Sequence, residues 1–169
     1  MNLKKKFTAG VLLASLFLTA CSNSDNSGAT SNDAGSDKAA VDASETIKIG
    51  NSAPLTGPVS VYGITTNNGI KLAVEEINAN GGVLGKDLEW SELDDKGEIT
   101  DAVNNYNKLV EEGARAVFGG ITSKPSLAMA ETAVNDDVVF ITPTGTQANI
   151  TEGKDNAFRT AIIDPFQGE

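Results

Sequence analysis

From Thr46 onward, the sequence alternates between short apolar segments and longer segments in which apolar residues recur every three or four positions. Short connections separate these segments. Such an alternation predicts repeated strand–helix–strand units, which build a parallel sheet with helices on both faces. We therefore expect an α/β fold. The expected strands span 46–54, 87–95, 114–120, 138–144 and 156–162, and the expected helices span 63–82, 98–113 and 123–137.

Each helical segment places apolar side chains on one stripe, which should face the sheet. Gly81 and Gly82 follow the first helix at the position of a C-cap. The expected inward-facing residues are Ile70, Ala73, Val74 and Ile77 in the first helix, Ile99, Ala102, Val103, Tyr106, Leu109 and Val110 in the second, and Leu127, Ala130, Ala133 and Val134 in the third.

The last letters of the sequence, DPFQGE, indicate the start of a further helix. Asp164 is expected as its N-cap, Pro165 at the first helical position and Gln167 at the third, which is a capping-box arrangement. The sequence stops at Glu169, directly after this signal. We infer that it is truncated and that part of the functional surface is missing.

Residues 1–20 have the layout of an export signal, in which three lysines precede an apolar stretch too short to span a bilayer. This segment ends in the letters LTAC, which resemble the bacterial lipobox. In lipoproteins the cysteine at this place, here Cys21, becomes the new N-terminus and carries a diacylglyceryl group, and two acyl chains suffice to anchor a protein. Residues 21–45, rich in Ser, Asn, Asp, Gly and Ala, are interpreted as the lipidated cysteine and a flexible tether. A free cysteine in an ordinary signal peptide is the alternative.

Composition excludes several classes of function. The sequence contains no histidine, which excludes a Ser-His or Cys-His nucleophile and a histidine-based zinc site within this chain. Its single cysteine excludes an intramolecular disulfide. The net charge of -10 becomes -13 when residues 1–20 and their three lysines are removed. This acidity argues against nucleic-acid binding, and nothing in the sequence calls for a cofactor or a metal.

An anion site is expected where the parallel strands end, because the loops after the first, third and fourth expected strands should meet there. In the segment VFGGITSKPS, Gly119 and Gly120 let the backbone approach a ligand, and Ser123 is the predicted helix N-cap. A carboxylate there would gain hydrogen bonds from the N–H groups of the first helical turn and from the hydroxyls of Ser123 and Thr146. The pattern predicts a site for a small acid that requires no arginine or lysine.

Each of these residues also has a purely structural interpretation. Ser123 can serve only as a helix cap, Thr146 can be an ordinary loop hydroxyl, and Tyr62 can be a surface or hinge aromatic residue. Trp90 lies in an expected strand and is interpreted as a core residue rather than a ligand platform.

Asp94 and Asp95 follow an expected strand, where acids can bind magnesium. Turn and cap roles are the favoured interpretation. If these acids do bind magnesium, the corresponding hypothesis is an enzyme or a phospho-acceptor domain built on the same sheet, which would use Asp94 or Asp95. The export signal, the tether and the lack of a paired base count against it, so we expect no enzymatic activity.

The letters of residues 47–95, IKIGNSAPLTGPVSVYGITTNNGIKLAVEEINANGGVLGKDLEWSELDD, resemble the opening of branched-chain amino-acid-binding proteins. These are solute-binding components of ABC importers with the type I periplasmic-binding-protein fold. The segments VFGGITSKPS, ITPTGTQANIT and FRTAIIDPFQG follow in the order and spacing of that family. The resemblance covers essentially all of residues 46–169.

The resemblance implies two α/β lobes that close on an amino acid between them. Residues 46–169 would then be the N-terminal, incomplete part of this ligand-binding domain, with the sheet of the first lobe. Ser123 and Thr146 would hold the α-carboxylate of the ligand. The main-chain carbonyl of Thr144 would accept from the α-ammonium group, and Tyr62 would line the cleft near the ligand side chain.

The resemblance also marks what this sequence lacks. Family members often carry a disulfide at two positions that are Gly97 and Thr122 here, so that bridge is absent. In the family, the second lobe and a segment that returns to the first lobe follow the position of Glu169. We therefore expect weak or no ligand binding from these residues alone, and one sheet edge without a partner.

The function implied by the resemblance is transport. We expect a monomeric extracytoplasmic lipoprotein on the outer face of the cell membrane, which captures an amino acid, branched-chain first of all. Hinge closure would trap the ligand, and an ABC permease would receive it, with no bond made or broken. A sensor, or a binder of a related small amide or carboxylate on the same fold, is the alternative.

Overall fold

The computed structural model describes residues 46–168, so the predicted export signal, Cys21 and the whole of the predicted tether lie outside the described residues. Strands and helices alternate along the described part of the chain, as the sequence predicts. The strands are β1 (Ile47–Ala53), β2 (Leu88–Asp94), β3 (Ala116–Gly119), β4 (Val139–Thr142) and β5 (Ala157–Arg159). The helices are α1 (Ser60–Ala79), α2 (Ile99–Glu111), α3 (Ser123–Ala133), the short 3-10 helix η1 (Ala148–Ile150) and α4 (Asp164–Gln167).

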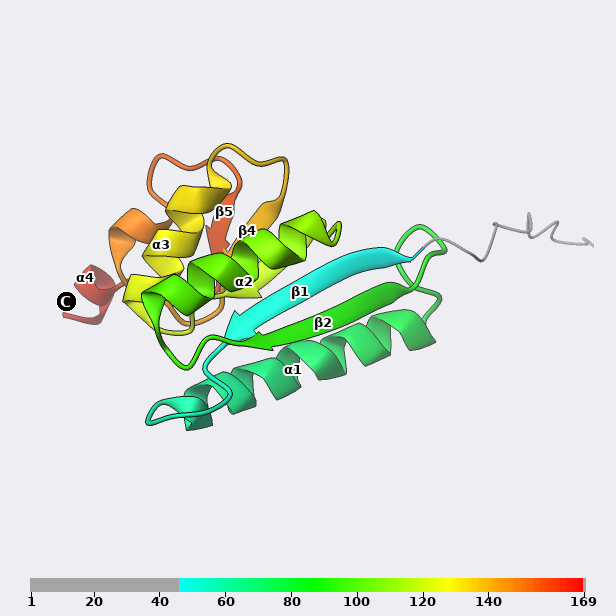
Figure 1. Ribbon diagram of the computed structural model, residues 1–169, viewed down its shortest axis with the longest axis horizontal. Helices are drawn as coiled ribbons and strands as arrows, with labels where there is room; N and C mark the ends of the chain where they lie inside the picture. Colours follow the sequence, from blue (N-terminus) through cyan, green and yellow to red (C-terminus); the bar gives the residue numbers. More distant parts are fainter. Residues whose placement is uncertain (1–45, 169) are drawn as a thin grey trace, which may run out of the picture. The chain divides into compact units, whose positions relative to one another are not determined.

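The strands form one parallel sheet in the order β2-β1-β3-β4-β5 (Figure 1). Asn51 of β1 lies opposite Glu92 of β2 on one side and Phe118 of β3 on the other. Within residues 46–168, β2 and β5 are the two edges of the sheet. Because all strands run in the same direction, the loops after them converge at one edge of the sheet.

Two neighbouring residues of β1 show that helices cover both faces of the sheet. The Asn51 amide nitrogen donates to the side-chain oxygen of Asn67 in α1 (3.0 Å). The next residue, Ser52, accepts from the amide nitrogen of Asn105 in α2 (3.2 Å). Successive side chains of a strand point to opposite faces, so α1 and α2 lie on opposite sides. The predicted α/β class, with helices on both faces, is confirmed.

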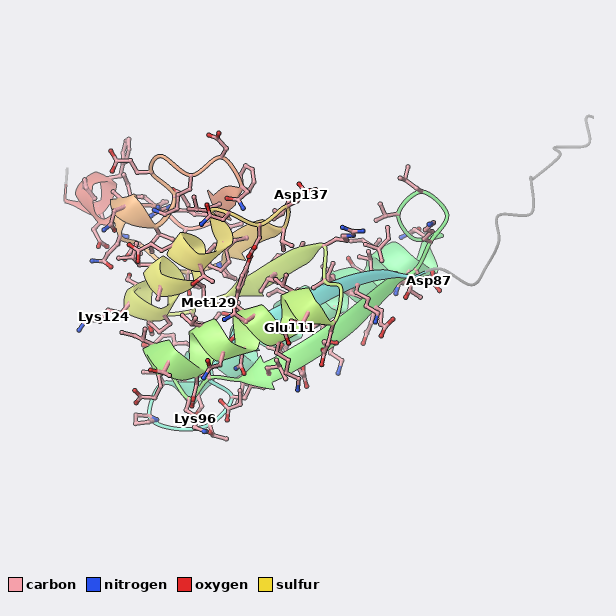
Figure 2. All side chains as sticks on the ribbon, turned by 45° about the horizontal axis from the view of Figure 1, so that its top comes forward. Asp87, Lys96, Glu111, Lys124, Met129 and Asp137 are labelled. Atoms are coloured by element: carbon pink, nitrogen blue, oxygen red, sulfur yellow. The ribbon has the colours of Figure 1, made fainter. Side chains whose placement is uncertain are left out.

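The hydrophobic core lies between the sheet and the pair α2 and α3, which pack against each other (Figure 1). Met129 of α3 is fully buried and lies between the two helices in Figure 2. Tyr106 of α2 and Phe140 of β4 are also fully buried. Burial, and then the neighbouring Asp136 carboxylate, raise the pKa of Tyr106 far above its ordinary value. Its hydroxyl therefore stays protonated and donates to Asp136 (3.0 Å).

The predicted inward face of α1 is only partly correct. Val74 is buried, but Ala73 and Ile77 are exposed, and the buried stripe continues through Asn67 and Gly63. The reason is that α1 packs mainly on β1 and β2 at one side of the sheet, so that a narrow stripe is covered. Two other residues predicted to face inward are also exposed. Ile99 at the start of α2 is 45% exposed, and Val134 beyond the end of α3 is 48% exposed. Both residues lie at helix ends, where the sheet no longer covers them.

The capping prediction for the end of α1 is confirmed, and the capping prediction for the start of α4 is wrong. Gly81 follows α1 with φ of 96°, and its N–H donates to Asn78 O (3.0 Å), as expected of a C-cap glycine. The predicted capping box of α4 is wrong, because Ile163 is the N-cap and no side chain caps it. Asp164 is already the first helical residue, and its N–H donates to Thr146 O (3.2 Å). Among residues 46–168, no helix has the length and apolar character needed to cross a membrane.

Candidate ligand-binding site

A pocket of about 480 Å³ opens where the loops after β1, β3 and β4 converge. All four residues predicted to contact a ligand line it, although they come from separate parts of the sequence. Cys21, the predicted lipidation site, lies outside the described residues. Sequence reasoning missed the other lining residues, but each lies within three positions of a predicted one. The pocket is lined by Val59, Tyr62, Ile121, Thr122, Ser123, Thr144 and Thr146.

The first turn of α3 presents open backbone donors beside this pocket. Thr122, with φ of -100° and ψ of 154°, is the N-cap, and no side chain caps the helix. The prediction of Ser123 as the N-cap is therefore wrong by one position, because Ser123 is already helical. Within residues 46–168, the N–H groups of Ser123 and Lys124 and the Ser123 hydroxyl have no hydrogen-bond partner. These groups are free to bind a ligand, and the helix end adds partial positive charge.

Two glycines bring β3 close enough to α3 for this arrangement. A Cβ at Gly119 would lie 2.6 Å from Cε of Met129 and 2.8 Å from Ser52 O. Gly120 has φ of 58°, and a Cβ there would lie 2.2 Å from Cα of Ser126. A side chain at Gly120 would require α3 to shift, and a side chain at Gly119 would require β1 and the Met129 side chain to move. The glycines therefore set the place of the first turn of α3.

The loop after β4, residues 143–147, is tied to the segment before α3. The Thr144 hydroxyl donates to Ile121 O (2.5 Å), and the Gly145 N–H donates to the Thr142 hydroxyl (3.0 Å). That hydroxyl in turn lies 2.9 Å from the Ser126 hydroxyl of α3. The Thr146 hydroxyl and the Thr144 main-chain carbonyl have no partner among residues 46–168. The loop therefore offers one hydroxyl and one carbonyl to a ligand.

Side chains of α1 and the β3–α3 connection make the pocket apolar on another side. Val59 precedes α1, Tyr62 lies in its first turn, and Ile121 follows β3. Tyr62 is 64% exposed, as a side chain in an open half of a cleft should be. Lys124, the cation nearest in sequence to Ser123, projects outward from the start of α3 (Figure 2) and does not line this pocket.

Close approach of α1 to the loop after β1 places Val59 and Tyr62. A Cβ at Gly63 would lie 2.1 Å from the carbonyl oxygen of Pro54. Asp94, the last residue of β2, fastens the same loop, since its carboxylate accepts from Leu55 N–H (2.9 Å) and from the Thr56 hydroxyl (2.6 Å). Partial burial raises the pKa of Asp94, but these hydrogen bonds and those from other backbone N–H groups outweigh it and hold the pKa below its ordinary value.

Asp95 is fully buried and has a different role. Its carboxylate accepts from Gly97 N–H (2.8 Å) and from the Ser52 hydroxyl (3.0 Å). Burial, the largest influence, raises the pKa of Asp95 above its ordinary value. Among the described residues, no group of three or more acidic, histidine or cysteine side chains is placed to hold a metal ion. Asp94 and Asp95 both accept hydrogen bonds from N–H groups of the turn after β2, as expected of turn residues. Trp90 packs on Phe118 (ring centroids 6.3 Å apart) and does not line the pocket.

A parallel sheet with a pocket beyond the carboxyl ends of its strands, lined by hydroxyls, open N–H groups and apolar side chains, defines a class of small-molecule-binding folds. Comparison with known proteins specifies the family. The profile of the periplasmic binding proteins matches residues 46–165. The chain therefore belongs to the periplasmic binding protein family, as the sequence motifs predicted.

Individual relatives and structures agree with this assignment. The Leu/Ile/Val-binding protein BraC3 of Rhizobium johnstonii is 40% identical over 124 residues, which are 73% of this chain and 34% of that protein. The branched-chain amino-acid substrate-binding protein LivJ of Streptococcus pneumoniae, solved with isoleucine, is similar with a TM-score of 0.68 and 36% identity, over 71% of this chain and 35% of that one. A solute-binding protein of Rhodopseudomonas palustris, solved with 3,4-dihydroxybenzoic acid, has a TM-score of 0.64 and 26% identity, over 70% and 32%. The chain spans about a third of the length of these proteins.

Proposed function

We propose that the protein carrying this chain is the solute-binding component of an ABC importer and captures an amino acid, branched-chain ones first. The observation that carries the proposal is the division of the pocket into two kinds of surface. One side offers the hydroxyls of Ser123 and Thr146 with two open N–H groups, and the other side is apolar. The names of two relatives, which concern leucine, isoleucine and valine or isoleucine alone, support the same choice.

The proposed binding mode follows from the partners that each group lacks. The ligand carboxylate accepts from the Ser123 and Lys124 N–H groups at the start of α3 and from the Ser123 and Thr146 hydroxyls. The ligand ammonium donates to the main-chain carbonyl of Thr144. The aliphatic side chain contacts Val59, Ile121 and the ring of Tyr62. No cationic side chain lines the pocket, so helix-end dipole and hydrogen bonds carry the anion recognition.

The proposal extends to transport. Residues 1–20 direct export, Cys21 carries the lipid, residues 21–45 act as the tether, and residues 46–169 supply one face of the binding cleft. Because the pocket is open on one side, tight binding requires a second surface that closes over the ligand. Closure stabilises the liganded state by contacts made only in that state, and the membrane permease then receives the amino acid. The protein acts as a monomer at the outer face of the membrane, without catalysis or cofactor.

Titration calorimetry of the complete gene product against leucine, isoleucine and valine tests the proposal. The double variant Ser123→Ala with Thr146→Ala should lose about 1.5–3 kcal/mol of binding free energy for each charge-assisted hydrogen bond, which is tenfold or more in affinity for each hydroxyl. Thr100→Ala is the matched control, because Thr100 is exposed in α2 and lines no part of this pocket. Unchanged affinity of the double variant would remove both hydroxyls from the site.

A second candidate is a binder or sensor of a small carboxylate that has no amine. The relative solved with 3,4-dihydroxybenzoic acid favours it, and so does the anion side of the pocket, which recognises a carboxylate whether or not an ammonium group follows. The same calorimetry with 3,4-dihydroxybenzoate separates the two. Binding of the aromatic acid without binding of any amino acid would select the second candidate.

A further inference from the structure

Arg159, the last residue of β5, donates hydrogen bonds to the backbone of the loop that carries Thr144 and Thr146 and to the start of η1. One guanidinium nitrogen donates to Gly145 O (3.3 Å). The other donates to Ala148 O (3.0 Å) and to the Thr151 hydroxyl (2.8 Å). All three acceptors are neutral, and within residues 46–168 no carboxylate lies in salt-bridge distance of Arg159. The hydrogen bonds of the guanidinium thus hold the conformation of residues 145–151.

The hydrogen bond to Gly145 has a consequence inside the pocket. Gly145 and Thr146 share one peptide plane, in which the carbonyl and the N–H point in opposite directions when the bond is trans. If the Gly145 carbonyl faces Arg159, the Thr146 N–H faces away from it. This N–H has no acceptor among the described residues, and Thr146 lines the pocket. Arg159 therefore orients a donor that the ligand can use, without lining the pocket itself.

The other hydrogen bonds of this loop do not fix the orientation of the Gly145–Thr146 peptide, which depends on Arg159. The Gly145 N–H donates to the Thr142 hydroxyl, and the Thr146 carbonyl accepts from Asp164 N–H. These bonds hold the two ends of the Gly145–Thr146 pair. The peptide between them is held on its carbonyl side by the guanidinium, the donor bonded to Gly145 O in the described part of the chain. A planar fork with fixed donor directions suits this task better than an ammonium group.

We infer that Arg159 is a positioning residue of the ligand site, which turns the Gly145–Thr146 peptide so that the N–H and hydroxyl of Thr146 face the ligand carboxylate. This inference rests on the proposed function and adds to it a residue outside the pocket. Three variants test it in the complete gene product. Arg159→Met removes the fork, Arg159→Lys keeps the charge, and Lys154→Met is the matched control, since Lys154 donates to Asn149 O (2.7 Å) in the same segment.

The expected result is a loss of leucine affinity of about tenfold or more in Arg159→Met, a partial loss in Arg159→Lys, and a change within about twofold in Lys154→Met. A double-mutant cycle identifies the route of the effect. Arg159→Met combined with Thr146→Ala should fall short of the summed losses, while Arg159→Met combined with Ser123→Ala should come closer to the sum. Wild-type affinity in Arg159→Met, or additivity with Thr146→Ala, would overturn the inference.

Hydrogen exchange of the Gly145 amide keeps the inference separate from the proposed function, because it needs no ligand. This amide donates to the Thr142 hydroxyl, and its exchange reports whether the loop keeps its shape. We expect faster exchange at Gly145 in Arg159→Met and Arg159→Lys than in Lys154→Met. Unchanged exchange in both Arg159 variants would contradict the positioning role. Absence of amino-acid binding in the unmodified protein would contradict only the proposed function.

Discussion

The two edge strands of the sheet, β2 and β5, end in side chains of opposite charge that perform the same task. Asp94 ends β2 and accepts hydrogen bonds from the N–H groups of the loop after β1. Arg159 ends β5 and donates to carbonyl groups of the loop after β4. Each edge strand thus shapes the loop of its inner neighbour, and residues of both loops line the pocket.

The two edges differ in how their charged residues, Asp94 and Arg159, respond to pH. A carboxylate loses its charge in acid, whereas a guanidinium keeps its charge at every pH at which the protein is folded. Val59 and Tyr62, which depend on the Asp94 side, should therefore be sensitive to pH. The loop with Thr144 and Thr146, which depends on Arg159, should not be. The substitutions below test this comparison, beginning with the largest expected effect.

Gly63→Ala should disturb the Asp94 side most. The added Cβ would lie 2.1 Å from the Pro54 carbonyl oxygen, so α1 or the loop after β1 has to move. We expect a loss of about 1–3 kcal/mol in the free energy of unfolding, as for other overpacked sites, together with weaker leucine binding. Urea denaturation and calorimetry of the complete gene product measure the two effects.

Gly69→Ala is the control for this substitution, because Gly69 lies in the same helix and a Cβ there meets nothing within 4 Å. Alanine should stabilise the helix at this place by up to about 1 kcal/mol. Equal effects of the two substitutions would show that the close contact at Gly63 does not place α1.

Asp94→Asn should have a smaller effect, since asparagine keeps one acceptor oxygen. The carboxylate accepts from the N–H groups of Leu55, Thr56 and Lys96 and from the Thr56 hydroxyl, which one amide oxygen cannot replace. We expect a loss of about 1–1.5 kcal/mol in unfolding free energy, measured by urea denaturation. Asp101→Asn is the control, because the ion pair of Asp101 with Lys96 is exposed, and such a contact is worth about 0–1 kcal/mol. A loss at Asp101 as large as at Asp94 would refute the special role of Asp94.

The pH dependence of stability should separate Asp94 from Asp95, with the smallest effect of the three. The lowered pKa of Asp94 means that its contribution is present above the ordinary aspartate pKa of about 4 and is lost as the pH falls through the lowered value. The raised pKa of Asp95 has the opposite sign, because the buried carboxylate destabilises the fold when ionised. Its contribution therefore becomes more favourable as the pH falls from the raised pKa toward about 4.

Urea denaturation of the unmodified protein, Asp94→Asn and Asp95→Asn at several pH values from about 7 to about 3 measures this difference. The stability deficit of Asp94→Asn relative to the unmodified protein should shrink in acid. Over the same range, the free energy of unfolding of Asp95→Asn should fall relative to that of the unmodified protein. Trends of the same sign for both variants would contradict the assignment of opposite pKa shifts.

Local patterns were sufficient for the predictions that depended on a residue's neighbours in sequence. Periodicity predicted the order and type of the main elements, and the glycines after α1 marked its end, because both signals arise within a few residues of the chain. The meeting of Ser123 and Thr146 could be predicted as well, since parallel strands bring the loops that follow them to one edge whatever their distance in sequence. Ser123 and Thr146 line one pocket for this reason.

The sequence by itself determined the α/β class, the family and four of the residues that line the pocket, Tyr62, Ser123, Thr144 and Thr146. Only the tertiary structure decided that α1 buries Asn67 and Gly63 rather than Ala73 and Ile77, and that Arg159 holds the loop of Thr146. The physical reason is that these outcomes depend on which elements become neighbours across the sheet. Arg159 and Gly145 are brought together by the pairing of β4 with β5, and no pattern within either strand encodes that contact.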